Sequence, residues 1–170
     1  EDAGVSGLKL KLGYMSSDAV QSAQALLIQE QLKEVGVTVE LAGGDGTAIA
    51  NAMKDPDNEY DMYLGGYIMG IDPDTFSSLF ENDGAYNYMH YSGYDTIDQL
   101  FEEGRSELDE SARKETYAKL QAAVQDTGAF YPIISNNKIL VVNNRIQGVE
   151  DAGLVPVYTF EDTSSLKIAE

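Results

Sequence analysis

The chain has 170 residues, of which 11 are Lys or Arg and 29 are Asp or Glu, so its formal net charge is −18. This length fits one domain with a sizeable core, and a hydrophobic content of 43% is typical of a globular protein. The acidic balance argues against nucleic acid or an anionic membrane surface as a partner. Without cysteine and with one histidine, the composition excludes disulfides, thiolate catalysis and metal sites built on Cys or several His.

The first half of the chain alternates between the patterns of strands and helices. The predicted elements are a strand over residues 8–14, a helix over 17–35, a strand over 37–41, a helix over 48–54 and a strand over 60–67. Ser16 or Ser17 is the expected cap of the first helix, and Gly36 is its expected end. Strands separated by helices pair in parallel, so we expect an α/β fold with a mixed, mainly parallel sheet sandwiched by helices.

The second half of the chain predicts a long loop, two helices, a hairpin and an arm. These are a turn-rich loop over residues 68–94, helices over 97–108 and 117–124, hairpin strands over 130–135 and 138–142, and a loose arm over 145–170. The helices follow from apolar residues at helical spacing, and the hairpin follows from the Asn136-Asn137 turn between two strand-like runs. Long connections are often functional, which makes the loop a candidate site.

Motifs that would carry cofactor or catalytic chemistry are weak in this chain. Gly44-Asp45-Gly46 follows a predicted strand, but Ile49 stands where a dinucleotide fingerprint needs its third glycine. His90 is the only imidazole, and no motif places a Ser or Asp around it for nucleophilic catalysis. We therefore expect no cofactor, no metal site and no enzymatic activity.

The segment from Leu64 to Asp74 is the strongest candidate for a ligand site. It leaves the predicted third strand at its carboxyl end, which is the edge where ligands bind in open α/β sheets. Its glycines would let a ligand approach backbone N–H and C=O groups directly. The same residues are explained equally well by a flexible, glycine-containing end of the strand that has no ligand role.

Several motifs, in this order, resemble the oligopeptide-type solute-binding proteins of ABC importers, bacterial extracellular family 5. They are Gln29 to Glu40, Tyr60-Asp61-Met62, Gly65-Gly66-Tyr67, Asp72-Pro73-Asp74 with Phe76, Asn87, Tyr91-Ser92, Asp98-Gln99-Leu100, Arg113 ahead of Tyr117, and Pro132. No single motif is specific, but together they span residues 8 to 148. The resemblance implies a type II periplasmic-binding-protein-like fold with two lobes that close on a ligand.

The resemblance also implies what this chain is and where it works. Residues 1–170 are expected to form the second lobe, excised from a longer protein, with the arm over 145–170 running back toward the first lobe. The expected partners are a peptide or other small solute, the first lobe and the ABC permease subunits. Nucleic acid is not an expected partner. The expected location is extracytoplasmic, in the periplasm or lipid-anchored as a lipoprotein on the outer face of the membrane.

Ligand-binding residues are carried over from the family by position. They are Gly65, Gly66, Tyr67, Ile68, Met69, Gly70, Asp72 and Tyr88. Peptide-binding members often have an Asp three residues after the aromatic, which pairs with the α-ammonium of the peptide, and Gly70 stands at that position here. Either Asp72 or Asp74 substitutes for this Asp, or the ligand is not a simple peptide.

A second hypothesis belongs to another functional class. The chain would then be a free-standing α/β domain with a small-molecule or hydrolytic pocket that uses Asp61 or Asp72 with His90. Family members that carry non-peptide solutes remain a third possibility.

Overall fold

The computed structural model describes residues 6–68, 70–90, 94–135, 137, 139–155 and 159–169. The chain divides into two compact units. The first consists of Glu1–Tyr67 with Tyr88–His90, and the second of Ile68–Asn87 with Tyr91–Glu170. The prediction of a single lobe over residues 1–170 stays a prediction, and each unit is described here by itself.

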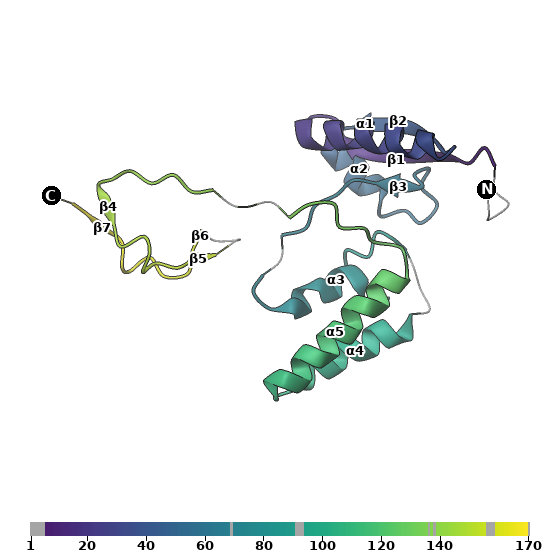
Figure 1. Cartoon of the computed structure of the whole chain (residues 1–170). Helices are drawn as coiled ribbons and strands as arrows, with labels where there is room; N and C mark the ends of the chain where they lie inside the picture. Colours follow the sequence, from purple (N-terminus) through teal and green to yellow (C-terminus); the bar gives the residue numbers. More distant parts are fainter. Residues whose placement is uncertain are drawn as a thin grey trace. The chain divides into compact units, whose positions relative to one another are not determined.

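The first unit is built on a parallel three-stranded sheet (Figure 1). Strands β1 (Lys9–Met15), β2 (Thr38–Gly44) and β3 (Met62–Tyr63) lie in the order β2-β1-β3. Leu12 of β1 pairs with Leu41 on one side and Met62 on the other, both in parallel. The predicted α/β fold with a mainly parallel sheet is thus confirmed.

Helix α1 (Ala19–Glu34) covers one face of this sheet and forms the core with it (Figure 1). The buried residues of this core are Leu12, Ala25, Val39 and Leu64. The predicted cap was wrong by one or two residues, because the Asp18 carboxylate accepts the N–H groups of Val20 and Gln21. Gly36 ends the helix as expected, with φ at +84°, a conformation that glycine adopts without strain.

Helix α2 (Gly46–Ala52) begins two residues earlier than predicted. The Asp45 side chain caps it by accepting the N–H groups of Thr47 and Ala48. Gly46 is close to Met15, since a Cβ at this glycine would lie 2.6 Å from the Met15 sulfur. A side chain at residue 46 would therefore displace Met15 at the end of β1.

Strand β3 is much shorter than the predicted strand over residues 60–67. Asp61 donates its N–H to the Lys11 carbonyl, and Leu64 donates its N–H to the Gly13 carbonyl, so the chain follows β1 only between these points. Beyond Leu64 the two glycines have no side chains with which to pack. The exit from β3 therefore comes directly before the candidate segment.

The described residues of the second unit include four helical segments. They are η1 (Pro73–Phe76), α3 (Ser77–Phe80), α4 (Asp95–Ser106) and α5 (Glu110–Asp126). Helices α4 and α5 pack side by side, which confirms the two predicted helices (Figure 1). Their buried side chains are Ile97, Leu100, Phe101, Tyr117 and Leu120.

The predicted hairpin over residues 130–142 was wrong. Among the described residues of this stretch there is no strand, and Asn136 and Lys138 lie outside the described residues. Further on, β4 (Ile146–Gln147) pairs with β7 (Lys167–Ile168), and β5 (Leu154–Val155) pairs with β6 (Thr159–Phe160), both antiparallel. The sequence showed no period in this region because two-residue strands are too short to display one.

Candidate functional site

The candidate segment begins where the chain leaves β3. Leu64 is buried in the core, whereas Gly65, Gly66 and Tyr67 directly after it are exposed. A Cβ on Gly66 would have no neighbouring atom within 4 Å, and a Cβ on Gly65 would meet only the Tyr63 ring at van der Waals distance. Packing within the described chain therefore does not require glycine at residue 66, and its backbone is open to approach.

Tyr88 lies in the same unit as these residues and is half-buried. Burial raises the pKa of the Tyr63 hydroxyl to about 12, with a smaller contribution from the neighbouring Tyr88. The structure thus brings Tyr88 near Tyr63, the residue that ends β3. Tyr63, whose hydroxyl is protonated at neutral pH, therefore lies with Tyr88 at the start of the candidate segment.

The remaining predicted residues that the structure describes belong to the second unit. Ile68 and its neighbour Ile71 are exposed, and Met69 lies outside the described residues. Gly70 is half-buried, and a Cβ on it would lie 3.3 Å from the Thr75 methyl group, which is a tight contact. A larger residue at position 70 would require Thr75 to move.

Asp72 has two structural roles in the second unit. Its carboxylate caps η1 by accepting the Asp74 N–H at 2.8 Å. The same carboxylate accepts the Arg113 Nη2–H group at 2.9 and 3.1 Å. The Asp74 N–H, followed by Arg113, lowers the pKa of Asp72, so this carboxylate is ionised at neutral pH and already has partners.

Arg105 makes a second set of ion pairs next to the first. It contacts Asp74 at 3.1 Å, Glu81 at 2.7 Å and Glu102 at 3.1 Å. Sequence reasoning assigned no role to Arg105 or to the side chain of Arg113. Both are basic residues in a strongly acidic chain, which suggests that they form ion pairs. Their acidic partners are distant in sequence, so the sequence alone does not identify them.

The hydrolytic hypothesis gains no support from the positions of its residues. His90 Nε2 lies 2.6 Å from the Met53 carbonyl oxygen, and Asp61 Oδ2 accepts the Lys11 N–H at 2.7 Å. Asp72 is held by Arg113 in the other unit. Each proposed catalytic group is thus engaged with a structural partner.

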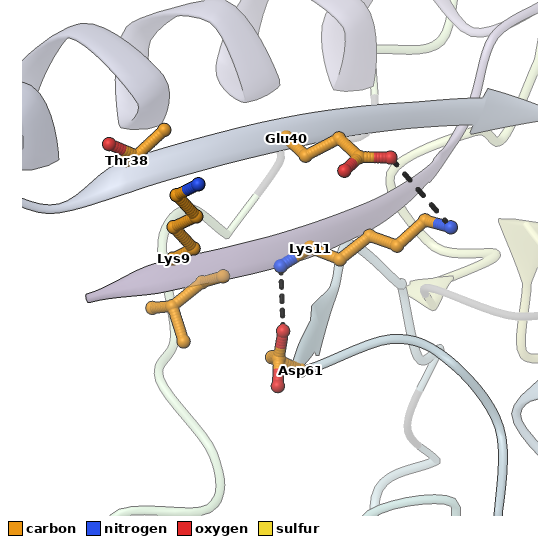
Figure 2. A pocket seen from close by; sticks show the side chains of 6 residues that line it. Lys9, Lys11, Thr38, Glu40 and Asp61 are labelled. Atoms are coloured by element: carbon orange, nitrogen blue, oxygen red, sulfur yellow. Dashed lines mark hydrogen bonds and ion pairs between the residues drawn. The ribbon is translucent and has the colours of Figure 1, made fainter. Parts of the chain in front are cut away.

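A shallow pocket of about 380 Å³ lies on the first unit, beside β1 and β2 (Figure 2). It is lined by Lys9, Leu10, Lys11, Thr38, Glu40 and Asp61. The Lys11 ammonium binds Glu59 at 2.6 Å and Glu40 at 3.8 Å, and Asp61 accepts the Lys11 N–H. The Lys11 ammonium is paired with Glu59 and Glu40, and the Asp61 carboxylate holds the backbone of β1, so we assign this pocket no ligand.

Metal ligation and membrane insertion have no support in the described parts of the chain. Within these ranges, no group of three or more His, Asp or Glu side chains is arranged to hold a metal ion. No helix in the same ranges combines the length and the apolar character that crossing a membrane requires.

One family profile matches the first half of the chain. The family is described as "Bacterial extracellular solute-binding proteins, family 5 Middle", and the match covers residues 1–88. The matched region contains the sheet, α1, α2 and the segment from Gly65 to Asp72. The family that the sequence motifs resemble is therefore the family whose profile matches.

Individual relatives agree with the family profile. The chain is 25% identical over 151 residues to the peptide transport periplasmic protein SapA of Haemophilus influenzae, covering 84% of this chain and 27% of the relative. The crystal structure of the ABC transporter substrate-binding protein CtaP of Listeria monocytogenes is 37% identical, with a TM-score of 0.86, and covers 99% of this chain. Only 35% of CtaP is matched in return.

The fold recurs at lower identity in a peptide complex. The oligopeptide-binding protein AppA of Bacillus subtilis, solved with a nonapeptide, is 20% identical with a TM-score of 0.64. The match covers 76% of this chain and 27% of AppA, and it shows the fold alone. In each of these three comparisons, this chain spans about a quarter to a third of the similar protein.

Proposed function

The chain belongs to family 5 of the bacterial extracellular solute-binding proteins, and from this premise we propose that it is the ligand-binding second lobe of an oligopeptide-type receptor. The receptor captures a peptide or a similar solute outside the cytoplasm and delivers it to an ABC importer. It binds and releases its ligand without transforming it. The names of SapA, a peptide transport protein, and of CtaP, an ABC transporter substrate-binding protein, support this reading.

The exposed backbone directly after β3 is the observation that carries this proposal. Gly65 and Gly66 follow a buried strand end, and a Cβ on Gly66 would meet no atom of the described chain. A peptide in extended form can pair its backbone with such a segment, and main-chain hydrogen bonds of this kind give affinity with little side-chain selectivity. The Tyr67 and Tyr88 rings offer apolar faces with polar hydroxyls for the ligand's side chains.

The receptor needs more chain than these residues. This chain matches 35% of CtaP, which leaves room in the whole protein for the first lobe. Closure of two lobes around a ligand selects one conformation, and the permease recognises that conformation. We place the receptor in the periplasm or, with a lipid anchor, on the outer face of the membrane, as the family's extracellular character favours.

The proposal is tested on the full-length protein with Gly66→Val. Because the added side chain meets nothing in the described chain, the fold should be unchanged while the approach of a ligand backbone is blocked. We expect binding of a mixture of short synthetic peptides, measured by native mass spectrometry, to fall at least tenfold, the ratio that about 1.4 kcal/mol corresponds to. Ala118→Val, at an exposed position of α5, is the matched control. Equal binding by both variants would contradict the proposed site.

A solute without a free amino terminus is the second candidate. Gly70 has no side chain, and the carboxylates of Asp72 and Asp74 are each already paired with an arginine, which favours such a solute. Peptides with free and with acetylated amino termini distinguish the two candidates. Tighter binding of the free form would contradict the second candidate, and equal binding would support it.

A further inference from the structure

Two arginines join the segment after Ile71 to the helix pair α4 and α5. Arg113 of α5 contacts Asp72, and Arg105 of α4 contacts Asp74 and Glu81. Together these ion pairs hold both ends of the stretch from Asp72 to Glu81, which contains η1 and α3. We name this arrangement, formed by Arg105, Arg113, Asp72, Asp74 and Glu81, the arginine clamp.

Arg113 is the more constrained of the two arginines. Its Nε donates to the Gly104 carbonyl at 2.9 Å, and its Nη2 donates to both carboxylate oxygens of Asp72 at 2.9 and 3.1 Å. Its guanidinium also lies over the Tyr117 ring, 5.0 Å from the ring centre. A guanidinium held by a carbonyl, a carboxylate and an aromatic face has one orientation, which a lysine cannot reproduce.

A glycine makes this orientation possible. A Cβ on Gly104 would lie 2.8 Å from the Tyr117 ring, so α4 and α5 approach closely only because residue 104 has no side chain. The same close approach places the Gly104 carbonyl within reach of Arg113. The clamp therefore depends on the packing of α4 against α5.

The clamp fixes Asp72, which directly follows the exposed side chain of Ile71. Ile71 is 81% exposed and is bonded covalently to Asp72, and Ile68 is also exposed. A side chain of this kind, facing solvent on a segment that is held in place, is preorganised for contact, because less conformational freedom is lost when a ligand binds. An exposed ion pair adds little to global stability, so its effect should be on local order.

We propose that Arg105 and Arg113 are positioning residues, which hold the stretch from Gly70 to Asp74 in the conformation that contacts the solute. The inference rests on the proposed function, since it assigns these arginines to the same ligand segment. It also means that Asp72 serves the segment as an anchor to Arg113 and is not an acceptor for a cationic group of the solute. The apolar surface of Ile71 contacts the solute in its place.

The first experiment measures local order without a ligand. Amide hydrogen exchange of the full-length protein is compared between wild type, Arg113→Gln and the matched control Lys114→Gln, which removes the same charge at the next, exposed position. We expect the amides of Asp74 and Thr75 to exchange roughly two- to fivefold faster in Arg113→Gln, the ratio that an exposed ion pair supplies. Unchanged exchange in Arg113→Gln, or an equal increase in Lys114→Gln, would overturn the clamp.

Two further variants guard against a general loss of folding. Asp72→Asn keeps a side-chain oxygen to cap η1 but removes the charge that binds Arg113, and Arg113→Lys keeps the charge but loses the Nε bond to Gly104. We expect Asp72→Asn to accelerate exchange as Arg113→Gln does, and the double variant to add nothing further. Arg113→Lys should give an intermediate value. Fully additive effects of the two single changes would show that the pair does not act as a unit.

The second experiment measures binding of the synthetic peptide mixture by the same variants. Arg113→Gln should weaken binding about two- to fivefold, whereas Lys114→Gln should leave it unchanged. Faster exchange with unchanged binding would overturn the positioning role. Failure of the wild type to bind any peptide would contradict the proposed peptide receptor, while the exchange data would still decide whether the clamp exists.

Discussion

The segment from 127 to 142 is richer in apolar residues than helices α4 and α5, yet the helix pair buries large apolar side chains that the segment leaves exposed. In the helix pair, Ile97 is 1% exposed and Phe101 is fully buried. In the segment that follows, Tyr131 is 85% and Val141 is 90% exposed. Both regions belong to the same unit.

The two regions differ in whether another element packs against their apolar side chains. Apolar residues of α4 recur at helical spacing and so form one face, and α5 supplies the opposing face within the next twenty residues. The described residues of the segment from 127 to 142 form no strand or helix, so their apolar side chains do not line up on one face. Phe130 meets the Phe80 ring edge-on at 5.3 Å, but Tyr131 beside it stays exposed. Apolar content predicts burial only where the chain also supplies the surface to be packed against.

The largest expected effect tests the buried side of this comparison. Phe101→Ala should lower the free energy of unfolding by about 3–5 kcal/mol, because it removes a fully buried ring and leaves a cavity. Urea denaturation followed by circular dichroism gives this value. Tyr131→Ala removes a ring of similar size from the exposed segment and should change the value by less than about 0.5 kcal/mol. Similar losses for both variants would contradict the comparison.

Gly104→Ala tests the close approach of α4 and α5. The added Cβ would lie 2.8 Å from the Tyr117 ring, so we expect a loss of about 1–3 kcal/mol although alanine favours helices. Thermal unfolding measures the change. Glu103→Ala, at the exposed neighbouring position, should be neutral or slightly stabilising. An increase in stability for Gly104→Ala would show that the two helices are not in contact there.

Asp18→Ala tests how much the N-terminal cap of α1 contributes to the stability of the first unit. The Asp18 carboxylate accepts two N–H groups at the start of α1, so its loss should lower stability by about 1 kcal/mol. Ser17→Ala, at the position that the sequence suggested as the cap, should have no measurable effect. Equilibrium unfolding in urea compares the two variants, and the reverse ranking would place the cap at Ser17.

The smallest effect at neutral pH concerns the Tyr63 hydroxyl. Burial raises its pKa to about 12 from an ordinary value of 10.0, so the stability it contributes is full below pH 10 and is lost as the pH rises through about 12. Absorbance at the tyrosinate band during alkaline titration should show a late phase near pH 12, and Tyr63→Phe should reduce its amplitude by one tyrosine, whereas Tyr117, whose pKa burial also raises, still titrates late. A titration without this late phase in the wild type would contradict the burial of Tyr63.

Periodicity predicted elements well where a whole face is buried. The strand at Lys9–Met15 and the helix at Asp95–Ser106 occur close to their predicted bounds. The helix at Glu110–Asp126 contains the predicted stretch over 117–124 but begins seven residues earlier. The predictions failed in two places. The hairpin predicted over residues 130–142 does not form among the described residues, and the third strand ends before the glycines at 65 and 66, which have no side chains to pack. Helix starts moved because Asp18 and Asp45 cap them, which the sequence allowed but did not single out.

The sequence by itself determined the order of strands and helices in the first unit, and with it the parallel sheet, together with the family motif from Gly65 to Tyr67. These follow from the alternation of residues within each element and from the helices that separate the strands. Only the tertiary structure decided that Asp72 binds Arg113, 41 positions away. Such a contact depends on how α4 packs against α5, and that packing depends on a glycine opposite the Tyr117 ring. Hydrophobic periodicity predicts each helix or strand separately, so it does not predict an ion pair between two elements.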